Sequence, residues 1–366
     1  MGRLHDLHAE HGQSPWLDNL KRGWITSGEL EQWVQGGVRG LTSNPTIFQK
    51  AIADSPDYDE QFGDLIGSGT SVEESYWALV GHDIEEALRI LRPVHDESGG
   101  IDGRVSVEVA PSLANDTAAT EAAARGLWQT IDEPNLFVKI PGTAAGLPAI
   151  RNCIAAGISI NVTLLFSLAR YDEVIEAYLS GLEALVADGG DPSQVASVAS
   201  FFVSRVDTNV DRRLDELGTP EAAALKGKAA VANAQLAYQL FLERFAGSRW
   251  DALAAAGARV QRPLWASTST KDPSYPDTLY VDTLIGPDSV NTLPDSTLAA
   301  FEDHGTLTRT VDRDPDAARA TVAALAELGI DLEEVAAVLE DEGVASFSKS
   351  FDELLTTLAT KAEQLR

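Results

Sequence analysis

The sequence predicts an α/β protein in which eight parallel strands, each followed by a helix, close into a (β/α)8 barrel. Short runs rich in Val, Ile, Leu and Phe alternate with longer Ala-, Leu- and Glu-rich segments of helical period. A length of 366 residues suits one barrel with additions, and no low-complexity segment, repeat or long linker marks a second domain. We therefore expect a single domain over 1–366, with the barrel over about 15–310 and a helical extension over about 311–366.

The expected elements follow one another regularly along the chain. A helix precedes the first strand, and two helical stretches, over about 316–328 and 331–365, complete the chain. Most intervals between strands have room for a crossover helix, but the interval 268–277 contains two prolines and is too short for one. The expected strands are 16–18, 40–44, 104–110, 136–140, 158–163, 195–203, 263–267 and 278–284.

Composition narrows the class of protein. No apolar run is long enough to span a membrane, and the first residues lack the apolar stretch of a signal peptide, so we expect a cytoplasmic protein. Cys153 is the only cysteine, which excludes an intrachain disulfide and four-thiolate metal sites and indicates a buried structural thiol. A formal net charge of −28 argues against nucleic-acid and membrane partners. We expect a small-molecule ligand, no metal and no cofactor.

Strand alternation predicts which side chains face the barrel interior. In LFVKIP, Val138 and Ile140 share the face that meets the helices, which turns Lys139 inward. The same reasoning turns polar side chains inward near the carboxyl ends of other strands, where barrel enzymes place their active sites. These side chains are Asp18, Thr42, Asn44, Ser106, Glu108, Asn161, Thr163, Ser200 and Ser267.

Lys139 is the strongest catalytic candidate, because burying a lysine among apolar neighbours is costly without a partner or a role. The partner would be Glu108, in a salt bridge; the role would be nucleophilic attack on a carbonyl carbon to form an imine. A protonated imine stabilises the carbanion left when an adjacent C–C bond breaks, so no metal is needed. Asp18 and Glu108 suit the two acid/base tasks of such a reaction.

Structural alternatives exist for the other polar residues. Asn44 precedes a proline and would cap a helix, Asn161 and Thr163 would cap the next helix, and Ser200 would only fill space. Phe347 and Phe351 lie one helical turn apart, and they would either fold over the barrel mouth or pack as part of an amphipathic helix.

Five segments resemble the signature segments of transaldolases, members of the class I Schiff-base aldolase superfamily: GLTSNPTIF, VSVEVAPSLANDT, LFVKIPGT, ISINVTLLFS and SFFVSRVD. The length, the C-terminal extension and WASTSTKDPSYPD resemble the longer bacterial branch of the family. The resemblance implies a TIM barrel that moves a dihydroxyacetone unit from a ketose phosphate to an aldose phosphate in the pentose phosphate pathway. It also implies that Lys139 forms the Schiff base. By the same resemblance, Asp18, Glu108 and Thr163 are catalytic, and Asn44, Asn161 and Ser200 hold sugar hydroxyls.

A sugar phosphate also needs local cations in so acidic a protein. Arg205 in SFFVSRVD resembles the family's phosphate arginine, and the alternative is an ion pair with Asp207 or Asp211. The usual place of a second arginine holds Ser269. We therefore expect Lys271 to reach the phosphate, with Ser267 and Ser269 donating hydroxyls and Asp272 as a competing partner.

Three other functions compete with this reading. The first is a fructose 6-phosphate aldolase that releases the three-carbon unit without an acceptor, since it would use the same lysine and carboxylates. The second is a non-catalytic sugar-phosphate-binding barrel, although no catalytic residue is missing. The third is a metal site on His5, His8 and His11, whose spacing is not a usual metal-binding pattern. The oligomeric state is left as monomer or homodimer.

Overall fold

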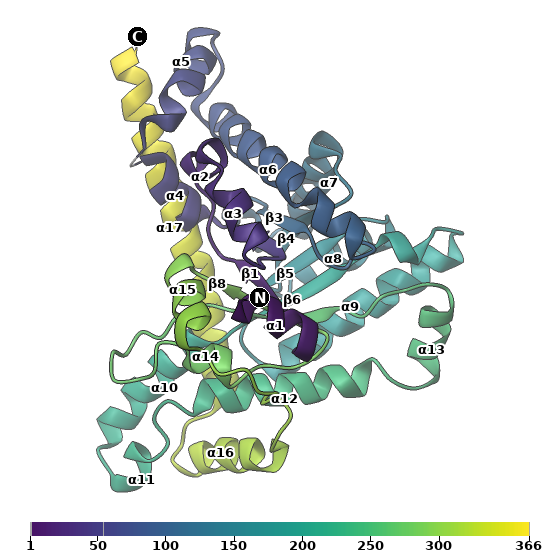
Figure 1. The fold of residues 1–366 in the computed structure, drawn as a ribbon, viewed down its shortest axis with the longest axis vertical. Coiled ribbons are helices and arrows are strands. Elements are labelled where there is room, and N and C mark those ends of the chain that lie inside the picture. The colour runs from purple at the N-terminus through teal and green to yellow at the C-terminus, as the bar shows by residue number, and fades with distance from the viewer. Residues whose placement is uncertain (1, 54, 366) are drawn as a thin grey trace.

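The computed structural model describes residues 2–53 and 55–365. Its centre is a closed barrel of parallel strands in sequential order, in which β1 pairs with both β2 and β8 (Figure 1). The strands are β1 (Gln13–Leu17), β2 (Gly40–Thr42), β3 (Arg104–Glu108), β4 (Leu136–Pro141), β5 (Ile160–Leu165), β6 (Ser197–Phe202), β7 (Arg262–Ala266) and β8 (Ser289–Leu293).

Helices surround the barrel and complete the TIM-barrel architecture that the sequence predicts. They are α1 (Arg3–His11), α2 (Arg22–Ser27), α3 (Glu29–Gln35), α4 (Pro45–Ala53), α5 (Asp59–Gly67), α6 (Val72–Glu97), α7 (Thr117–Ile131), α8 (Gly146–Ala155), α9 (Leu168–Ala187), α10 (Ser204–Leu217), α11 (Pro220–Ala223), α12 (Ala229–Arg244), α13 (Ser248–Ala255), α14 (Leu279–Asp282), α15 (Asp295–His304), α16 (Pro315–Glu327) and α17 (Leu332–Leu365). Short 3₁₀ turns η1 (Pro56–Tyr58), η2 (Pro111–Leu113) and η3 (Pro192–Gln194) lie between them.

Seven of the eight predicted strands are confirmed, but the eighth was wrong. The segment 278–284 contains the short helix α14, and the last strand is β8. Within 278–284, the Thr278 hydroxyl donates to the Asp282 carboxylate, a contact that favours a turn. The sequence of β8, SVNTL, contains only two apolar residues, so a search for apolar runs passes over it. All five of its residues are nevertheless buried, because β8 closes the barrel between β7 and β1.

The two ends of the barrel differ in chemistry. At the amino ends of the strands, the buried carboxylate of Asp102 is held by Arg39 at 2.7 Å and Arg262 at 3.0 Å, which lowers its pKa far below the usual range. His8 of α1 lies 3.5 Å from the same carboxylate. Within residues 2–53 and 55–365, no group of three His, Cys, Asp or Glu side chains is arranged to hold a metal ion. This end therefore consists of structural ion pairs.

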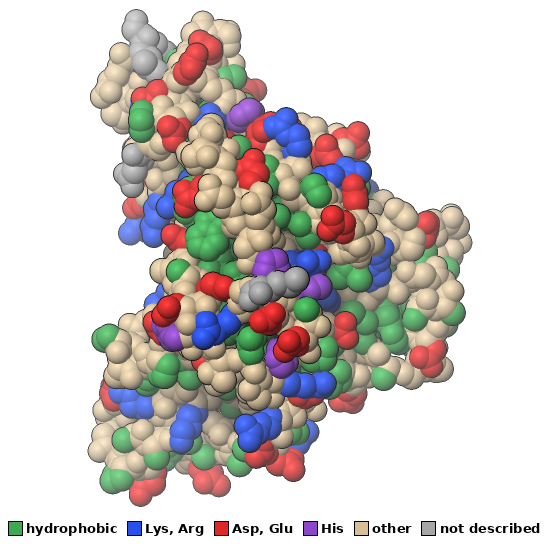
Figure 2. Space-filling view, viewed as in Figure 1, with side chains coloured by type: hydrophobic (Ala, Val, Ile, Leu, Met, Phe, Trp, Pro, Cys, Tyr) green, Lys and Arg blue, Asp and Glu red, His purple; other side chains and the backbone are tan. Residues whose placement is uncertain are grey.

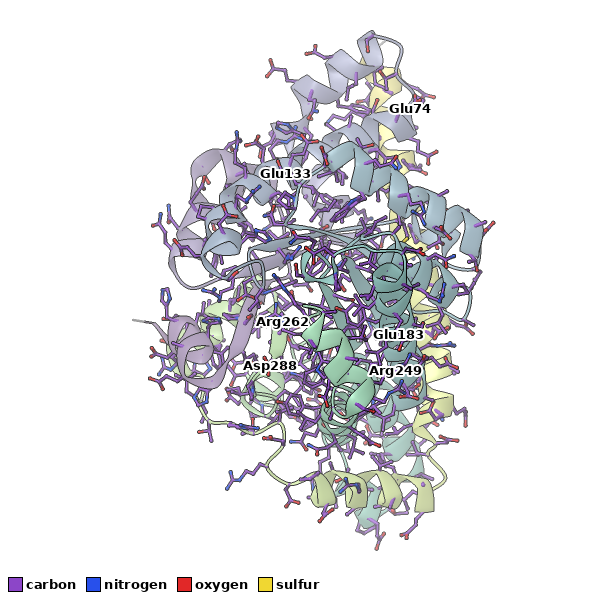
Figure 3. The ribbon with its side chains drawn as sticks, turned by 90° about the vertical axis from the view of Figure 1, so that its right-hand side faces the viewer. Glu74, Glu133, Glu183, Arg249, Arg262 and Asp288 are labelled. Atoms are coloured by element: carbon purple, nitrogen blue, oxygen red, sulfur yellow. The ribbon has the colours of Figure 1, made fainter. Side chains whose placement is uncertain are left out.

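The C-terminal helix α17 extends along one edge of the molecule beside α4 (Figures 1 and 3). The hydroxyls of Thr46 and Ser350 lie 2.9 Å apart, and the Gln49 amide donates to the Glu353 carboxylate at 2.9 Å. The predicted C-terminal helices are thus confirmed as α16 and α17, and α17 packs on the helix that follows β2.

Two further sequence predictions concern the burial of the cysteine and membrane-spanning segments. Cys153 is buried, as predicted, and burial raises its pKa to about 12. None of the described helices is long and apolar enough to cross a membrane. On the face drawn in Figure 2, Asp and Glu side chains are spread among Lys and Arg instead of gathering in one patch. This face thus carries no single-sign patch, although the chain as a whole has a formal net charge of −28.

Candidate active site

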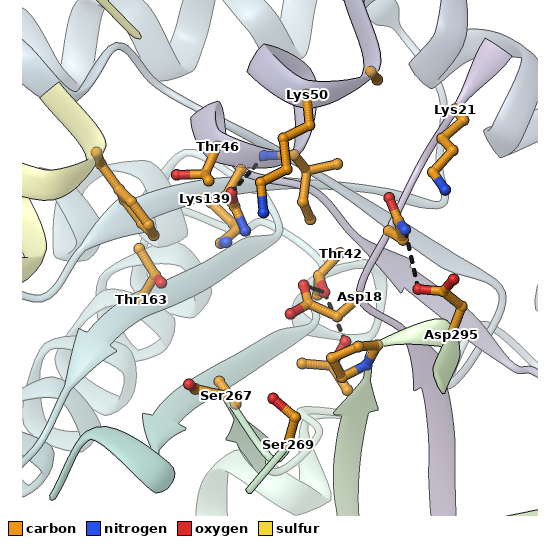
Figure 4. A pocket seen from close by; sticks show the side chains of 18 of the residues that line it. Asp18, Lys21, Thr42, Thr46, Lys50, Lys139, Thr163, Ser267, Ser269 and Asp295 are labelled. Carbon is orange, nitrogen blue, oxygen red and sulfur yellow. Dashed lines mark hydrogen bonds between the residues drawn. The ribbon is translucent and has the colours of Figure 1, made fainter. Parts of the chain in front are cut away.

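A cavity of about 740 Å³ opens at the carboxyl ends of the strands (Figure 4). Its lining comes from strands and loops far apart in sequence, as expected for a barrel active site. The predicted residues that line it are Asp18, Thr42, Asn44, Lys139, Thr163, Ser200, Arg205, Ser267, Ser269 and Lys271. Two predicted residues, Glu108 and Asn161, lie in the layer behind this lining and contact it.

Lys139 lies at the inner end of the cavity and is only 4% exposed. It is paired in register with Glu108 of β3, and its Nζ lies 3.2 Å from Glu108 Oε2. The same ammonium donates to the backbone oxygen of Ser43 at 3.0 Å. The predicted salt bridge and the predicted access to substrate therefore exist together, because Lys139 touches Glu108 on one side and the cavity on the other.

The two carboxyl groups occupy different places around Lys139. Burial raises the pKa of Glu108, and the attraction of Lys139 opposes that shift. Asp18 lies just beyond β1 at the cavity wall, where the displacement of bulk water raises its pKa as well. Its Oδ1 accepts a hydrogen bond of 2.7 Å from Thr42, whose hydroxyl also lies 2.6 Å from that of Thr292. Raised carboxyl pKa values suit groups that exchange protons during a reaction.

A chain of hydrogen bonds fixes the side chains on β5 and β6. The Ser200 hydroxyl donates to Asn161 Oδ1 at 2.7 Å, and the Asn161 amide donates to the Ser106 hydroxyl at 3.1 Å. The hydroxyl of Thr163 is buried and has no hydrogen-bond partner among the described residues, although it lines the cavity. Ser167, not Asn161 or Thr163, caps the following helix. The capping alternative is thus wrong for these two residues.

Asn44 fits its structural alternative. Its Oδ1 accepts a hydrogen bond of 3.0 Å from the backbone N–H of Ile47 and so caps the first turn of α4. The residue also lines the cavity, which leaves its amide nitrogen as the group that can face a substrate.

Arg205 lines the cavity, and its guanidinium lies against aromatic rings instead of forming an ion pair with a carboxylate. Its guanidinium carbon lies 5.3 Å from the ring centroid of Phe202 and 5.8 Å from that of Phe347. The predicted alternative partners are engaged elsewhere: Asp207 accepts from Tyr280 at 2.8 Å, and Asp211 accepts from Tyr275 at 2.7 Å. The ion-pair alternative for Arg205 is therefore wrong, and burial lowers its pKa.

The loop after β7 brings the remaining predicted residues to the cavity. The Lys271 ammonium donates to the Ser269 hydroxyl at 2.6 Å, while Asp272 accepts from the backbone of Ser274. Ser267 has a left-handed backbone, with φ of 57°, and its hydroxyl lies 2.9 Å from that of Ser204. Strand alternation alone does not place Ser267 correctly. Trp265, two residues earlier, packs outward and donates to the backbone oxygen of Leu284, so alternation would turn Ser267 outward as well. The left-handed turn brings Ser267 to the cavity instead.

Several lining residues were not predicted. Thr292 lies on the unpredicted strand β8, and Lys50 lies on α4, six residues after Asn44. Of the two predicted alternatives for the phenylalanines of the C-terminal helix, Phe347 takes the place at the cavity, whereas Phe351 packs against Tyr76 with ring centroids 5.2 Å apart. The available signal for Lys50 was its place in the helix that follows a catalytic strand end, within the segment SNPTIFQK.

Comparison with known proteins agrees with this geometry. A family model described as Transaldolase/Fructose-6-phosphate aldolase matches residues 15–358. A curated protein named Transaldolase from Parafrankia sp. (strain EAN1pec) is 54% identical over 357 residues, which cover 97% of this chain and 96% of the relative. Another protein of that name, from Thermobifida fusca (strain YX), is 53% identical over 361 residues, 98% of each chain. Transaldolase 1 of Streptomyces avermitilis is 53% identical over 354 residues, 96% of this chain and 94% of that protein.

Proposed function

This chain belongs to the transaldolase/fructose-6-phosphate aldolase family and is a transaldolase, and we propose that it works through a Schiff base on Lys139. The observation that carries the proposal is the placement of Lys139: a buried lysine at the inner end of a polar cavity, 3.2 Å from Glu108. Imine formation needs an amine that can lose a proton to a neighbouring group, and Glu108 lies at the distance required of such a group.

The donor would be a ketose phosphate such as fructose 6-phosphate or sedoheptulose 7-phosphate. The Lys139 nitrogen attacks the ketone carbon, and the carbonyl oxygen leaves as water after it has been protonated. Glu108 lies close enough to move these protons, and Thr163 offers a buried hydroxyl with no described partner to hold the departing water. The product is a protonated imine, which withdraws electrons from the adjacent carbon.

Cleavage then needs a base on the far side of the substrate. Asp18 takes the proton from the hydroxyl beside the scissile bond, and the C–C electron pair moves into the imine to give an enamine. The aldose phosphate leaves, and the three-carbon enamine attacks the aldehyde of an acceptor, such as glyceraldehyde 3-phosphate or erythrose 4-phosphate, as Asp18 returns the proton. Hydrolysis of the imine restores Lys139. Thr42 holds Asp18 at 2.7 Å for both steps.

Binding would be divided between two groups of residues. Asn44 and Ser200 would contact sugar hydroxyls, since both line the cavity. Asn161 would join them from the layer behind, where its side-chain oxygen accepts from Ser200. Arg205 and Lys271 would bind the phosphate, with Ser267 and Ser269 as hydroxyl donors. We propose that the reaction belongs to the pentose phosphate pathway of the cytoplasm and needs no metal or cofactor, and that the protein is a single-domain monomer or homodimer.

Borohydride reduction in the presence of fructose 6-phosphate tests the proposal. The reduced three-carbon adduct should be found on the peptide that contains Lys139, and an adduct on another lysine would contradict it. An assay with and without an acceptor aldehyde separates a transaldolase from an aldolase. Turnover of fructose 6-phosphate should depend on the acceptor, whereas a simple aldolase would release dihydroxyacetone without one.

A further inference from the structure

The cavity carries more positive charge than the sequence predicts. Besides Lys139, which pairs with Glu108, and Arg22, which pairs with Asp83, four cationic side chains line it: Lys21, Lys50, Arg205 and Lys271. None of these four has a carboxylate within 4.0 Å among the residues that the structure describes. Acidic residues outnumber basic ones by 56 to 28 in this chain, so unpaired cations that share one cavity indicate an anionic ligand.

Three of these cations reach the cavity from separate elements. Lys50 comes from α4, Arg205 from α10, and Lys271 from the loop after β7. Figure 4 shows Lys50 extending from its helix into the cavity on the side of Thr46 and Lys139. Lys21 differs from them, because its ammonium lies over the ring of Trp24, 4.4 Å from the centroid.

Lys271 responds to the charges of the other two cations. Its pKa is lowered first by burial and then by the charge of Arg205, with a further contribution from Lys50, while the negative charge of Asp18 opposes the shift. Like charges that line one cavity repel, and a bound dianion would relieve the repulsion. The Lys271 ammonium donates to Ser269 and the Arg205 guanidinium lies against aromatic rings, so neither cation forms a salt bridge with a described residue.

We infer that Lys50 is a further phosphate-binding residue, which with Arg205 and Lys271 surrounds the phosphate of the ketose from three sides. Ser269 occupies the place where the family resemblance implies a second arginine, so the loop after β7 contributes one cation, Lys271. Lys50 adds a further positive charge from α4. The inference rests on the proposed function and adds a residue that selects phosphorylated over unphosphorylated ketoses. Because Lys50 is exposed, salt screens its contribution more than that of Arg205.

The test compares Lys50→Ala with Lys50→Arg and with the control Lys349→Ala. The control removes the same charge from an exposed lysine whose partner is Glu353 on α17. Lys50→Ala should raise KM for fructose 6-phosphate by about three- to tenfold, leave kcat nearly unchanged and weaken inhibition by inorganic phosphate by a similar factor. Lys50→Arg should restore most of the loss, and Lys349→Ala should behave like the parent. Alanine is a good helix former, so α4 should keep its structure.

An unchanged KM for fructose 6-phosphate together with unchanged phosphate inhibition would overturn the assignment. So would an equal loss toward unphosphorylated fructose, because that pattern indicates a role in the cavity's shape. Borohydride trapping on Lys139 is measured in the same preparations. Failure of trapping in the parent enzyme would contradict the proposed mechanism, whereas trapping in the parent with unaltered phosphate affinity in Lys50→Ala would contradict only the role of Lys50.

Discussion

Lys139 and Glu108 occupy paired positions on adjacent parallel strands, and their charged groups lie 3.2 Å apart in the barrel interior. The register of β3 against β4 thus sets the distance between the proposed nucleophile and the proposed proton carrier. Because the two groups are in contact, we expect the pH dependence of activity to report the pair as a unit.

Lys139→Ala should abolish both turnover and borohydride trapping, because no other described lysine that lines the cavity contacts Glu108. Lys139→Arg should fail as well, since a guanidinium stays protonated and cannot attack a carbonyl. Both variants are checked by a coupled activity assay and by mass spectrometry of the reduced protein. Near-normal turnover in either variant would refute the role of Lys139.

The two carboxylates should fail at different steps. Asp18→Ala should still form the imine with fructose 6-phosphate, so its trapped adduct should accumulate while turnover drops. Glu108→Ala should slow formation of the adduct itself. General acid–base contributions are typically about 10²–10⁴-fold, so each loss is large but measurable. Rapid-quench trapping compares the two rates, and equal rates would remove the division of labour.

Arg205→Ala should raise KM for fructose 6-phosphate by roughly ten- to a hundredfold, because a charged phosphate contact contributes on the order of 1.5–3 kcal/mol. Lys271→Ala should give a smaller increase of the same kind. Activity toward fructose or dihydroxyacetone should change little in both variants. Steady-state kinetics with the phosphorylated and unphosphorylated donors provide the measurement, and parallel losses on both donors would place the phosphate elsewhere.

Phe347→Ala should make the position of the Arg205 side chain less fixed, because its guanidinium lies near the rings of both Phe202 and Phe347. We expect KM for fructose 6-phosphate to rise by about two- to fivefold with little change in kcat, a smaller effect than that of Arg205→Ala. Phe351→Ala is the matched control, since it removes the same side chain from the same helix where it packs on Tyr76. If both variants behaved alike, the effect would come from α17 as a whole.

Asp207 makes stability depend on pH in a defined direction. Burial raises its pKa from 3.8 to about 6, so the ionised form is less favourable in the folded protein than in the unfolded one. This group therefore favours folding below about pH 4, and the benefit is lost as the pH rises through 6. The free energy of unfolding of Asp207→Asn, relative to the parent, should increase by on the order of 2–3 kcal/mol between pH 4 and pH 7. Urea unfolding at the two pH values measures it; a constant difference would contradict the shift.

Strand alternation was enough to predict the inner part of the site. Lys139, Glu108, Asn161 and Ser200 all lie on regular strands, where a period of two decides which face a side chain takes. Ser267 reached the cavity for a different reason, a left-handed residue just after β7 that no alternation rule contains. Asn44 both caps a helix, through its side-chain oxygen, and lines the cavity.

The parts that sequence reasoning missed depend on tertiary structure. β8 is a strand because it closes a barrel, not because SVNTL is apolar, so its burial follows from its neighbours β1 and β7. Lys50 was missed and Phe347 was left with two alternatives because both lie on helices, and whether a helical residue faces a cavity depends on how the helix docks. For Phe347 the docking partner, α4, lies about 300 residues earlier in the chain, a separation that local patterns do not encode.

The position of Phe347 also bears on the order in which the parts of the site are made during synthesis of the chain. The ribosome releases a chain from its amino end, so all eight strands, the last of which ends at Leu293, emerge before α17 does. A nascent chain at that stage contains every strand of the barrel, including Lys139 and Glu108. Arg205, however, still lacks one of the two aromatic rings beside it, and α4 lacks the helix that packs against it. The surroundings of Arg205 are thus completed only after all the strands have been synthesised.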